Sequence, residues 1–511
     1  MSTINFCIIA AIVAYLLVML AVGFLFSKTN SDSTDFYLGG RKMGPLVTAM
    51  SAEASDMSSW LLMGLPGVAY LTGVCDAAWT AIGLALGTWF NWYFVARRLR
   101  RYSSSLGAIT VPQFFSRRFH EDKNLLNAIA ALVIVVFFVP YTASGFAACG
   151  KLFSTLFGWD YVLCMAVSAV IIVGYTVLGG FWAASVTDLI QSVIMTVALA
   201  AVLVFGVSSA GGMGAVLDNA GRVAGYLRLD AMGNVLTGET VSYGLLTIVS
   251  TMAWGLGYFG MPHILLRFMA IEDADKLKVS RRVGTVWVVI SMAIAIFIGI
   301  VGYGMVSAGA LEGFSSASAA EAIIVSIAKL ISRHGVLAAL LAGLILAGIL
   351  ASTMSTADSQ LLAASSSASH DLLCGLFRMD LSQKRKMLVA RVTLAVIAVL
   401  GVLLARDPNS SVFTIVSFAW AGFGAAFGPT MLAALFWKRT TWQGALAGML
   451  SGGAMVFVWK FAVKPMGGVW GIYELLPAFL VSLAAIIVVS LATPAPEQEI
   501  TNTFDAVRAV K

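Results

Sequence analysis

The stretch SAEASDMSSWLLMGLPG, residues 51–67, places two carboxylates and four serines inside an apolar run. A charge at the centre of a bilayer costs at least about 2.5–3.5 kcal/mol, so such a residue usually lines a cavity or meets a partner. Gly64, Pro66 and Gly67 follow and weaken a continuous helix. Interrupted helices at membrane depth are typical of secondary transporters. The stretch therefore predicts a broken membrane helix whose freed oxygens bind a cation such as sodium; the alternative is a wet kink near one end of the span.

The composition is that of a membrane protein. Of 511 residues, 59% are hydrophobic and 11% are charged, whereas soluble domains carry about 25% charged residues. The net charge of +7 fits basic loops on the cytoplasmic side of a membrane, so we expect no nucleic-acid partner. The five cysteines form no CxxC pair, which argues against a metal site or a disulfide framework.

Runs of about 20 apolar residues can cross a bilayer as helices. The first run is too long for a signal peptide and has no clear cleavage site, so we interpret it as a span. The segment 311–334 is weakly amphipathic and predicts a helix outside the membrane plane. We predict an all-α polytopic membrane protein with thirteen transmembrane helices at 5–27, 44–72, 74–96, 123–154, 158–180, 184–208, 240–264, 281–310, 335–367, 386–405, 411–437, 442–462 and 469–493.

Lysine and arginine are distributed unevenly between the loops. If the N-terminus is outside, the inner segments hold 24 of the 32 basic residues. This bias predicts an outside N-terminus and a cytoplasmic C-terminus. The longest outside loop, about 209–239, is too short for a catalytic domain, so we expect no enzyme.

A second polar cluster is LASTMSTADSQLLAASSSAS, residues 350–369. Four of its hydroxyls share one helix face: Ser352, Ser355, Thr356 and Ser359. Hydroxyls in a span usually bond back to a carbonyl one turn earlier or join helices, which accounts for two or three of them. Asp358 and the remaining hydroxyls instead predict an oxygen cage for a small monovalent cation.

The third cluster, AWGLGYFGMPHILLRF, spans residues 253–268. Its three glycines and Pro262 argue against a continuous helix. Trp254 and Tyr258 lie one turn apart and predict an aromatic wall, although aromatic residues also gather at membrane interfaces. The N-terminus of a half-helix here would favour a carboxylate.

Two further polar residues lie in or beside spans. Asp188 begins a span, where it is either a helix N-terminal charge or a functional group. Tyr141 follows a proline within a span, and its hydroxyl needs a partner if it is buried. The stretch AGFGAAFGP, residues 421–429, has no strand before it, so we interpret it as helix packing and not as a dinucleotide loop.

Four long motifs resemble those of the sodium:solute symporter family. They are DFYLGGRKMGPLVTAMSAEASDMSSWLLMGLPG (35–67), AWGLGYFGMPHILLRFMA (253–270), MSTADSQLL (354–362) and FAWAGFGAAFGP (418–429). The similarity runs from about residue 5 to 495 and is greatest to the proline branch of that family. It implies a core of two inverted five-helix repeats, each with a broken first helix. The implied segments are a first span and cytoplasmic loop (1–43), the two repeats (44–208 and 240–437) with an extracellular loop between them (209–239), two further spans (438–493) and a cytoplasmic tail (494–511).

The resemblance also implies site residues. The main sodium site would use the carbonyls of Ala54, Met57 and Ser352 and the hydroxyls of Ser355 and Thr356, with Asp56 as the acidic residue nearby. In some members a second sodium is held by the positions that match Asp188, Asp358 and Ser359, with Ser355 as a companion. The substrate pocket would include Ser58, Tyr141, Trp254, Tyr258 and Pro262. Arg41 matches a family arginine implicated in coupling.

The implied function is sodium-coupled uptake of L-proline by alternating access, with Na⁺ as the co-transported ion. We expect a bacterial inner-membrane protein whose partners are L-proline and the lipid bilayer, with no obligatory protein partner. Alternatives are symport of another amino acid, pantothenate, a sugar or sialic acid, and coupling to protons; a channel or a sensor fits the pattern less well. Glu53, Ser59, Met261 and Asp358 depart from the usual family pattern and leave the sodium number and the substrate range open.

Overall fold

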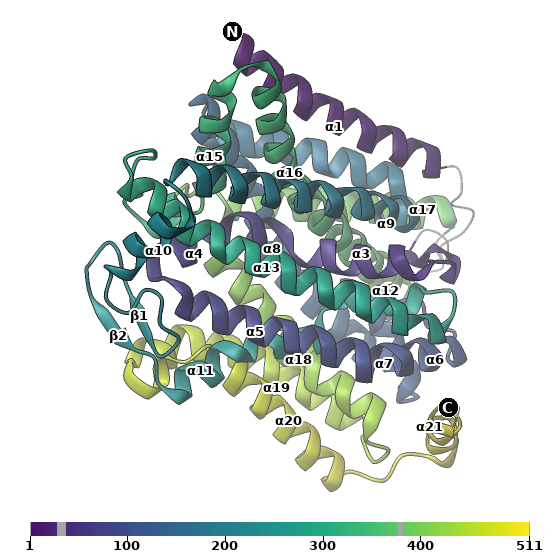
Figure 1. Cartoon of the computed structure of the whole chain (residues 1–511). Coiled ribbons are helices and arrows are strands. Elements are labelled where there is room, and N and C mark those ends of the chain that lie inside the picture. Colours follow the sequence, from purple (N-terminus) through teal and green to yellow (C-terminus); the bar gives the residue numbers. More distant parts are fainter. Residues whose placement is uncertain (1, 28–36, 377–381, 510–511) are drawn as a thin grey trace.

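The computed structural model describes residues 2–27, 37–376 and 382–509. Two residues counted above among the basic residues of the inner segments lie outside these ranges. They are Lys28, in the segment 28–36, and Arg378. Most long helices run side by side in one bundle, and the two ends of the chain lie at opposite ends of it (Figure 1).

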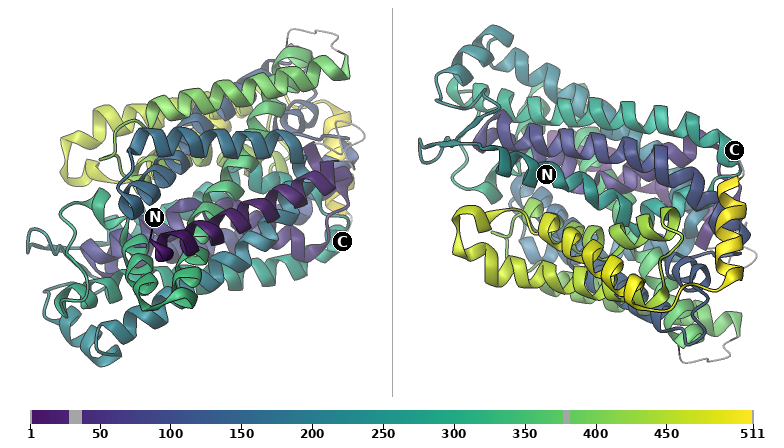
Figure 2. Two further views of the ribbon diagram at one scale, coloured as in Figure 1. Left: turned by 90° about the horizontal axis from the view of Figure 1, so that it is seen from above. Right: turned by 90° about the horizontal axis from the view of Figure 1, so that it is seen from below.

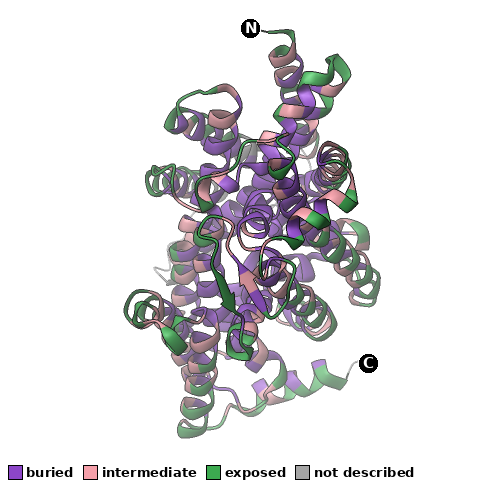
Figure 3. Cartoon of the chain, turned by 60° about the vertical axis from the view of Figure 1, so that its left-hand side comes forward, coloured by how far each residue is buried: buried purple, intermediate pink, exposed green. Residues whose placement is uncertain are grey.

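Nine helices in the described part of the chain are long and apolar enough to cross a membrane, and three shorter apolar helices accompany them. Each of the thirteen predicted spans overlaps a helix. Exposed leucines such as Leu337, 83% exposed, line the outside, whereas the buried residues gather in the centre (Figure 3). The long helices are α1 (Thr3–Ser27), α5 (Val74–Phe90), α8 (Leu125–Phe157), α9 (Tyr161–Ser209), α13 (Leu277–Ser307), α16 (Val336–Ser366), α17 (Gln383–Leu404), α18 (Val412–Phe436), α19 (Trp442–Val458) and α20 (Leu475–Ala492).

Two of the predicted spans are interrupted; the first bends at Met57, within the polar run 51–60 and before Gly64, Pro66 and Gly67, and the second is interrupted where glycine and proline cluster. The first consists of α3 (Pro45–Asp56), the π-helix η2 (Trp60–Gly64) and α4 (Leu65–Thr72). The second consists of α11 (Leu245–Met252), the 3₁₀-helix η4 (Ala253–Gly260) and α12 (Pro262–Ala270). Met57 forms the bend in the first, and Met261 is extended in the second. Both interruptions are buried, and at Met57 the backbone N–H and carbonyl still pair with Glu53 and Leu61.

Both interrupted segments pack against several long helices of the bundle. The long helices run along one another in two further views of the bundle (Figure 2). α3 packs against α9, α13 and α16, and η4 packs against α5 and α18. Glycine makes one of these contacts possible, because a Cβ on Gly87 of α5 would lie 2.2 Å from the carbonyl oxygen of Gly255 in η4. The backbones of α5 and η4 therefore touch directly.

Some element boundaries were predicted wrongly. The span expected from residue 240 begins instead at Leu245, because residues 240–242 form strand β2 (Thr240–Ser242), which pairs antiparallel with β1 (Ala231–Gly233). The span expected from 469 begins at Leu475. The spans predicted at 158–180 and 184–208 are, by contrast, two helices within α9, separated by a kink at the non-helical Gly180, where φ is +65°. The predicted tail contains the helix α21 (Gln498–Ala509).

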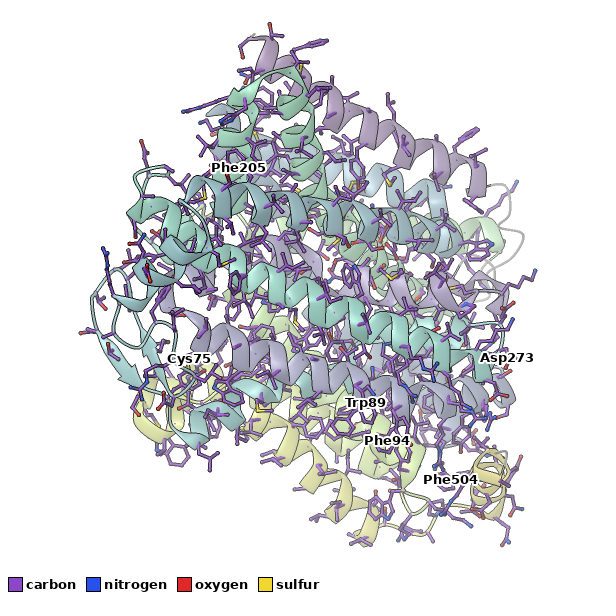
Figure 4. All side chains as sticks on the ribbon, viewed as in Figure 1. Cys75, Trp89, Phe94, Phe205, Asp273 and Phe504 are labelled. Atoms are coloured by element: carbon purple, nitrogen blue, oxygen red, sulfur yellow. The ribbon has the colours of Figure 1, made fainter. Side chains whose placement is uncertain are left out.

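The remaining short elements cap the two ends of the bundle. Asp273 and Phe504 lie at one end and Cys75 lies at the other (Figure 4). The segment 311–334 contains α15, whose apolar side chains are largely buried. The short helices are η1 (Gly39–Arg41), η3 (Asn91–Ala96), α6 (Arg97–Ser105), α7 (Val111–Arg118), α10 (Met213–Gly221), η5 (Ala274–Lys276), α14 (Ala317–Ala320), α15 (Ile323–Ile331), η6 (Ser332–His334), η7 (Ser367–Leu376), η8 (Trp459–Val463), η9 (Lys464–Met466) and η10 (Gly468–Gly471).

Candidate functional site

The end of α3 meets the hydroxyl face of α16 in the buried centre. The Ser355 hydroxyl donates to the carbonyl oxygen of Ala54 at 2.8 Å. The hydroxyls of Ser355 and Thr356 also lie 3.2 and 3.1 Å from the carbonyl oxygen of Ser352. Met57 follows α3 directly as its C-terminal cap. The structure therefore gathers hydroxyl and carbonyl oxygens, the groups that replace the hydration shell of a monovalent cation. We call these five residues the cation cluster.

Asp56 lies between the two interrupted helices. Its carboxylate accepts a hydrogen bond from the Tyr258 hydroxyl at 2.5 Å, and its carbonyl oxygen lies 3.4 Å from the Tyr141 hydroxyl. The Ser58 hydroxyl accepts from the backbone N–H of Trp60 at 3.1 Å. Asp56 thus links α3 to η4 and α8, one residue before the bend.

A small aromatic cavity of about 10 Å³, which has room for about one water molecule, adjoins Asp56. The Trp254 ring lies 5.8 Å from that of Trp60, and its carbonyl oxygen accepts from the Trp420 indole N–H at 2.7 Å. Phe413 lies 5.3 Å from Trp254 and adds a further ring to this cluster. The cavity is lined by Asp56, Met57, Trp60, Leu84, Tyr141, Trp254, Val416 and Trp420.

A second, polar cavity of about 10 Å³ shares Tyr141 with the aromatic one. Ser58, Ser59 and Thr356 line it, so it reaches the cation cluster. Thr142 and Gln360 hydrogen-bond across its wall at 3.1 Å. Pro262 lines neither cavity and begins α12.

Sequence reasoning named Trp254 and Tyr141, which line the cavities, and Tyr258, which lines neither, and it missed lining residues such as Trp60, Trp420, Thr142 and Gln360. Aromatic or polar residues within predicted spans are common, and only packing shows which of them face a cavity.

Asp188, Asp358 and Ser359 lie together, on α9 and α16. The Asp188 carboxylate accepts from the Ser51 hydroxyl at 2.6 Å, and Asp358 accepts from the Ser359 hydroxyl at 3.2 Å. The guanidinium of Arg267, from α12, reaches into the same cluster. Sequence analysis counted Arg267 only as a basic residue. An arginine within an apolar run, just after a predicted helix break, was the signal that could have identified it.

Glu53 points away from the cation cluster. One carboxylate oxygen accepts from the Trp92 indole N–H at 2.7 Å, and the other has no hydrogen-bond partner among the residues that the structure describes. A Cβ on Gly284 of α13 would lie 2.8 Å from this side chain. Glu53 is therefore wedged between α3, η3 and α13.

Arg41 lies outside the bundle centre, in η1 before α3, with φ of +57°. Its guanidinium donates to the carbonyl oxygens of Met269 at 2.8 Å and Ala108 at 2.5 Å. Burial, with a further contribution from Arg100, lowers the pKa of Arg41 to about 10. Arg41 therefore ties the start of α3 to the end of α12 and does not touch the cation cluster.

Comparison with known proteins adds to this geometry. The sequence model of the sodium:solute symporter family matches residues 36–452. The osmoregulated proline transporter OpuE of Bacillus subtilis is 39% identical over 97% of both chains. A sodium/proline symporter of Haemophilus influenzae is 42% identical over 96% of this chain and 95% of its own. The high-affinity proline transporter PutP of Bacillus subtilis is 40% identical over 95% of this chain and 98% of its own.

The fold is shared with a solved structure. It is a Na⁺-coupled sialic acid symporter in a substrate-bound, outward-open state, with a TM-score of 0.79 and 19% sequence identity over 97% of this chain and 100% of that one.

Proposed function

Because the chain belongs to the sodium:solute symporter family, we propose that it takes up L-proline together with sodium by alternating access. Members of this family are multi-pass membrane transporters, and sodium is the co-transported ion. Three relatives at 39–42% identity carry names that specify proline transport, and each aligns over at least 95% of both chains. This supports proline as the solute.

One observation carries the assignment of the ion site. The hydroxyl of Ser355 on α16 lies 2.8 Å from the carbonyl oxygen of Ala54 on α3, just before the bend in the broken helix. Sodium would insert here between the carbonyls of Ala54, Met57 and Ser352 and the hydroxyls of Ser355 and Thr356. The ion would then join α3 to α16, and its departure would release them. Asp56, one residue before the bend, supplies negative charge close by.

Proline would enter at the aromatic cavity, whose lining side chains would have to move apart because the cavity now has room for about one water molecule. The apolar ring of proline suits the rings of Trp254 and Tyr141, which line the cavity. Tyr258 lies behind the lining, and its hydroxyl donates to Asp56. Ser58 lies beside this cavity, and Pro262 opens α12, whose first N–H groups favour a carboxylate. Solute and sodium would thus meet on either side of the bend in α3.

The scaffold we propose has two inverted repeats, 44–208 and 240–437, whose first helices are the two interrupted ones. They are flanked by the segments 1–43 and 209–239, by two further spans in 438–493 and by the tail 494–511. Arg41 would couple the two interrupted helices, since it ties the start of α3 to the end of α12. The basic residues of α6 and α7 support a cytoplasmic location for the end of the bundle that contains these two helices. They therefore also support an N-terminus on the outside of the membrane.

The driving force is sufficient for concentrative uptake. Each sodium charge adds about 2.3 kcal/mol per 100 mV of membrane potential. Tenfold accumulation of a solute needs about 1.4 kcal/mol. A membrane potential of about 100 mV, acting on one sodium ion, therefore supports more than tenfold accumulation of the solute.

Uptake into proteoliposomes tests the proposal. Labelled proline should accumulate with an inward sodium gradient but not with a matched potassium gradient, and Asp56→Asn should reduce this accumulation. Unlabelled proline should compete, whereas sialic acid, pantothenate and sugars should not. Equal uptake without sodium would instead indicate proton coupling, and competition by another solute would reassign the substrate.

A further inference from the structure

Tyr473 lies in the segment between α19 and α20, beyond the two proposed repeats, yet it packs against the wall of the aromatic cavity. Its ring stacks on that of Trp254, with 5.3 Å between the ring centres and 19° between the ring planes. Trp254 lines the cavity, whereas Tyr473 does not. Tyr473 therefore stands directly behind one wall of the proposed solute site.

Two hydrogen bonds fix the position of Tyr473. Its backbone N–H donates to the Ser250 hydroxyl at 2.7 Å, and its own hydroxyl donates to the carbonyl oxygen of Ser417 at 2.6 Å. Ser250 belongs to α11, which leads into η4, and Ser417 follows the lining residue Val416 on α18. The ring is thus held between two elements that build this side of the cavity.

Ion pairs anchor the segment that carries Tyr473. The carboxylate of the next residue, Glu474, is fully buried and accepts from Lys464 at 2.8 Å and from Lys460 at 3.3 Å. Separation of these groups would leave a buried charge without a partner, which is strongly unfavourable. Leu475 follows and is fully buried against α18. Displacement of Tyr473 would therefore also break the contacts of the two residues after it.

The position of Trp254 limits the size of the solute that the cavity admits. The cavity has room for about one water molecule, so a solute enters only as the aromatic lining moves apart. Trp254 cannot retreat toward Tyr473, because the stacked ring already occupies that space. The room that opens for a solute is therefore limited on this side by a residue that does not touch the solute.

We propose that Tyr473 is a positioning residue that sets the size of solute accepted, because it blocks the retreat of Trp254. The inference rests on the proposed function, in which proline enters at this cavity. An apolar pocket separates solutes that differ by one methylene by about 10- to 200-fold. L-Pipecolate, the homologue of proline with a six-membered ring, is one methylene larger and is the solute that such a limit rejects.

A ratio of two constants measures this selectivity in proteoliposomes. It is the inhibition constant of pipecolate against labelled proline, divided by the KM for proline. Tyr473→Ala opens the space behind Trp254 and should lower the ratio about 2- to 12-fold, the factor that corresponds to one aromatic pair. A variant that only folds less well would lower the maximal rate and leave the ratio unchanged. An unchanged ratio in active Tyr473→Ala would overturn the proposal.

Two further variants separate ring stacking from general disturbance of the segment. Tyr473→Phe keeps the ring and loses only the hydrogen bond to Ser417, so it should keep the wild-type ratio. Trp470→Ala is the matched control, because Trp470 lies in the same segment, packs against Trp459 at 5.9 Å and lines neither cavity. It should also keep the wild-type ratio. The same fall in either variant as in Tyr473→Ala would overturn the role of stacking.

Tyr473→Leu answers the same question if Tyr473→Ala does not fold. Leucine keeps part of the buried apolar volume but offers no flat ring to Trp254, so the ratio should again fall, and a wild-type ratio would overturn the proposal. Failure of the proposed function is distinguishable, because it is seen in the wild type. If the wild type transports another solute, the ratio is measured with that solute and its homologue one methylene larger.

Discussion

Ser355→Ala should weaken sodium binding more than any other single hydroxyl removal in the cation cluster. The Ser355 hydroxyl lies 2.8 Å from the carbonyl oxygen of Ala54 and 3.2 Å from that of Ser352, so it stands between two of the proposed carbonyl ligands. A hydrogen-bonding group that acts on a charge contributes about 1.5–3 kcal/mol. Since about 1.4 kcal/mol is a factor of ten, the sodium concentration for half-maximal uptake should rise about 10- to 150-fold.

The assay is proline uptake into proteoliposomes as a function of external sodium, with potassium keeping the ionic strength constant. Ser352→Ala is the matched control. Its hydroxyl donates to the carbonyl oxygen of Ile349 at 2.8 Å, and only its backbone carbonyl is a proposed ligand. The control should therefore keep nearly the wild-type sodium dependence. An unchanged half-maximal sodium concentration in Ser355→Ala would refute the proposed ion site.

Two other substitutions test the solute cavity and the packing around it. Tyr258→Phe removes the hydrogen bond to Asp56 and should lower kcat/KM for proline about tenfold or more, because a bond to a charged group contributes about 1.5–3 kcal/mol; wild-type uptake kinetics would contradict the role of Tyr258. Gly257→Ala would place a Cβ 1.9 Å from the indole nitrogen of Trp420 and should lower the apparent Tm in detergent, since overpacking costs about 1–3 kcal/mol. Gly453→Ala, whose nearest contact would be 3.9 Å away, should melt near the wild-type temperature, and equal melting of the two variants would show that η4 is less tightly packed than the structure indicates.

Much of the fold could be predicted from the sequence, because membrane helices have a strong local signal. Apolar length located the spans, and clustered glycine and proline located the interruption in residues 253–262. The polar run at 51–60 predicted the bend at Met57 for a physical reason, since carboxylates and serines are too costly in lipid without a cavity. The errors lie at the ends of elements, where strand β2 and helix α21 depend on tertiary contacts.

The candidate site was less accessible to prediction. Helical spacing placed Ser355 and Thr356 on one face, but only packing shows that this face meets Ala54. Glu53 illustrates the limit most clearly. Its charge suggested a role in ion binding, yet its carboxylate turns toward Trp92. The direction in which a helical side chain points is set by neighbours that are distant in sequence, and no local sequence pattern indicates it.

The most direct test of sodium–proline symport is whether proline drives sodium movement. Proteoliposomes with equal sodium inside and outside would be supplied with external proline, and entry of ²²Na⁺ would be followed at zero membrane potential. We predict that proline accelerates ²²Na⁺ entry in the wild type and that this stimulation is lost in Ser355→Ala at low sodium. Entry of ²²Na⁺ at the same rate with and without proline would contradict coupled transport.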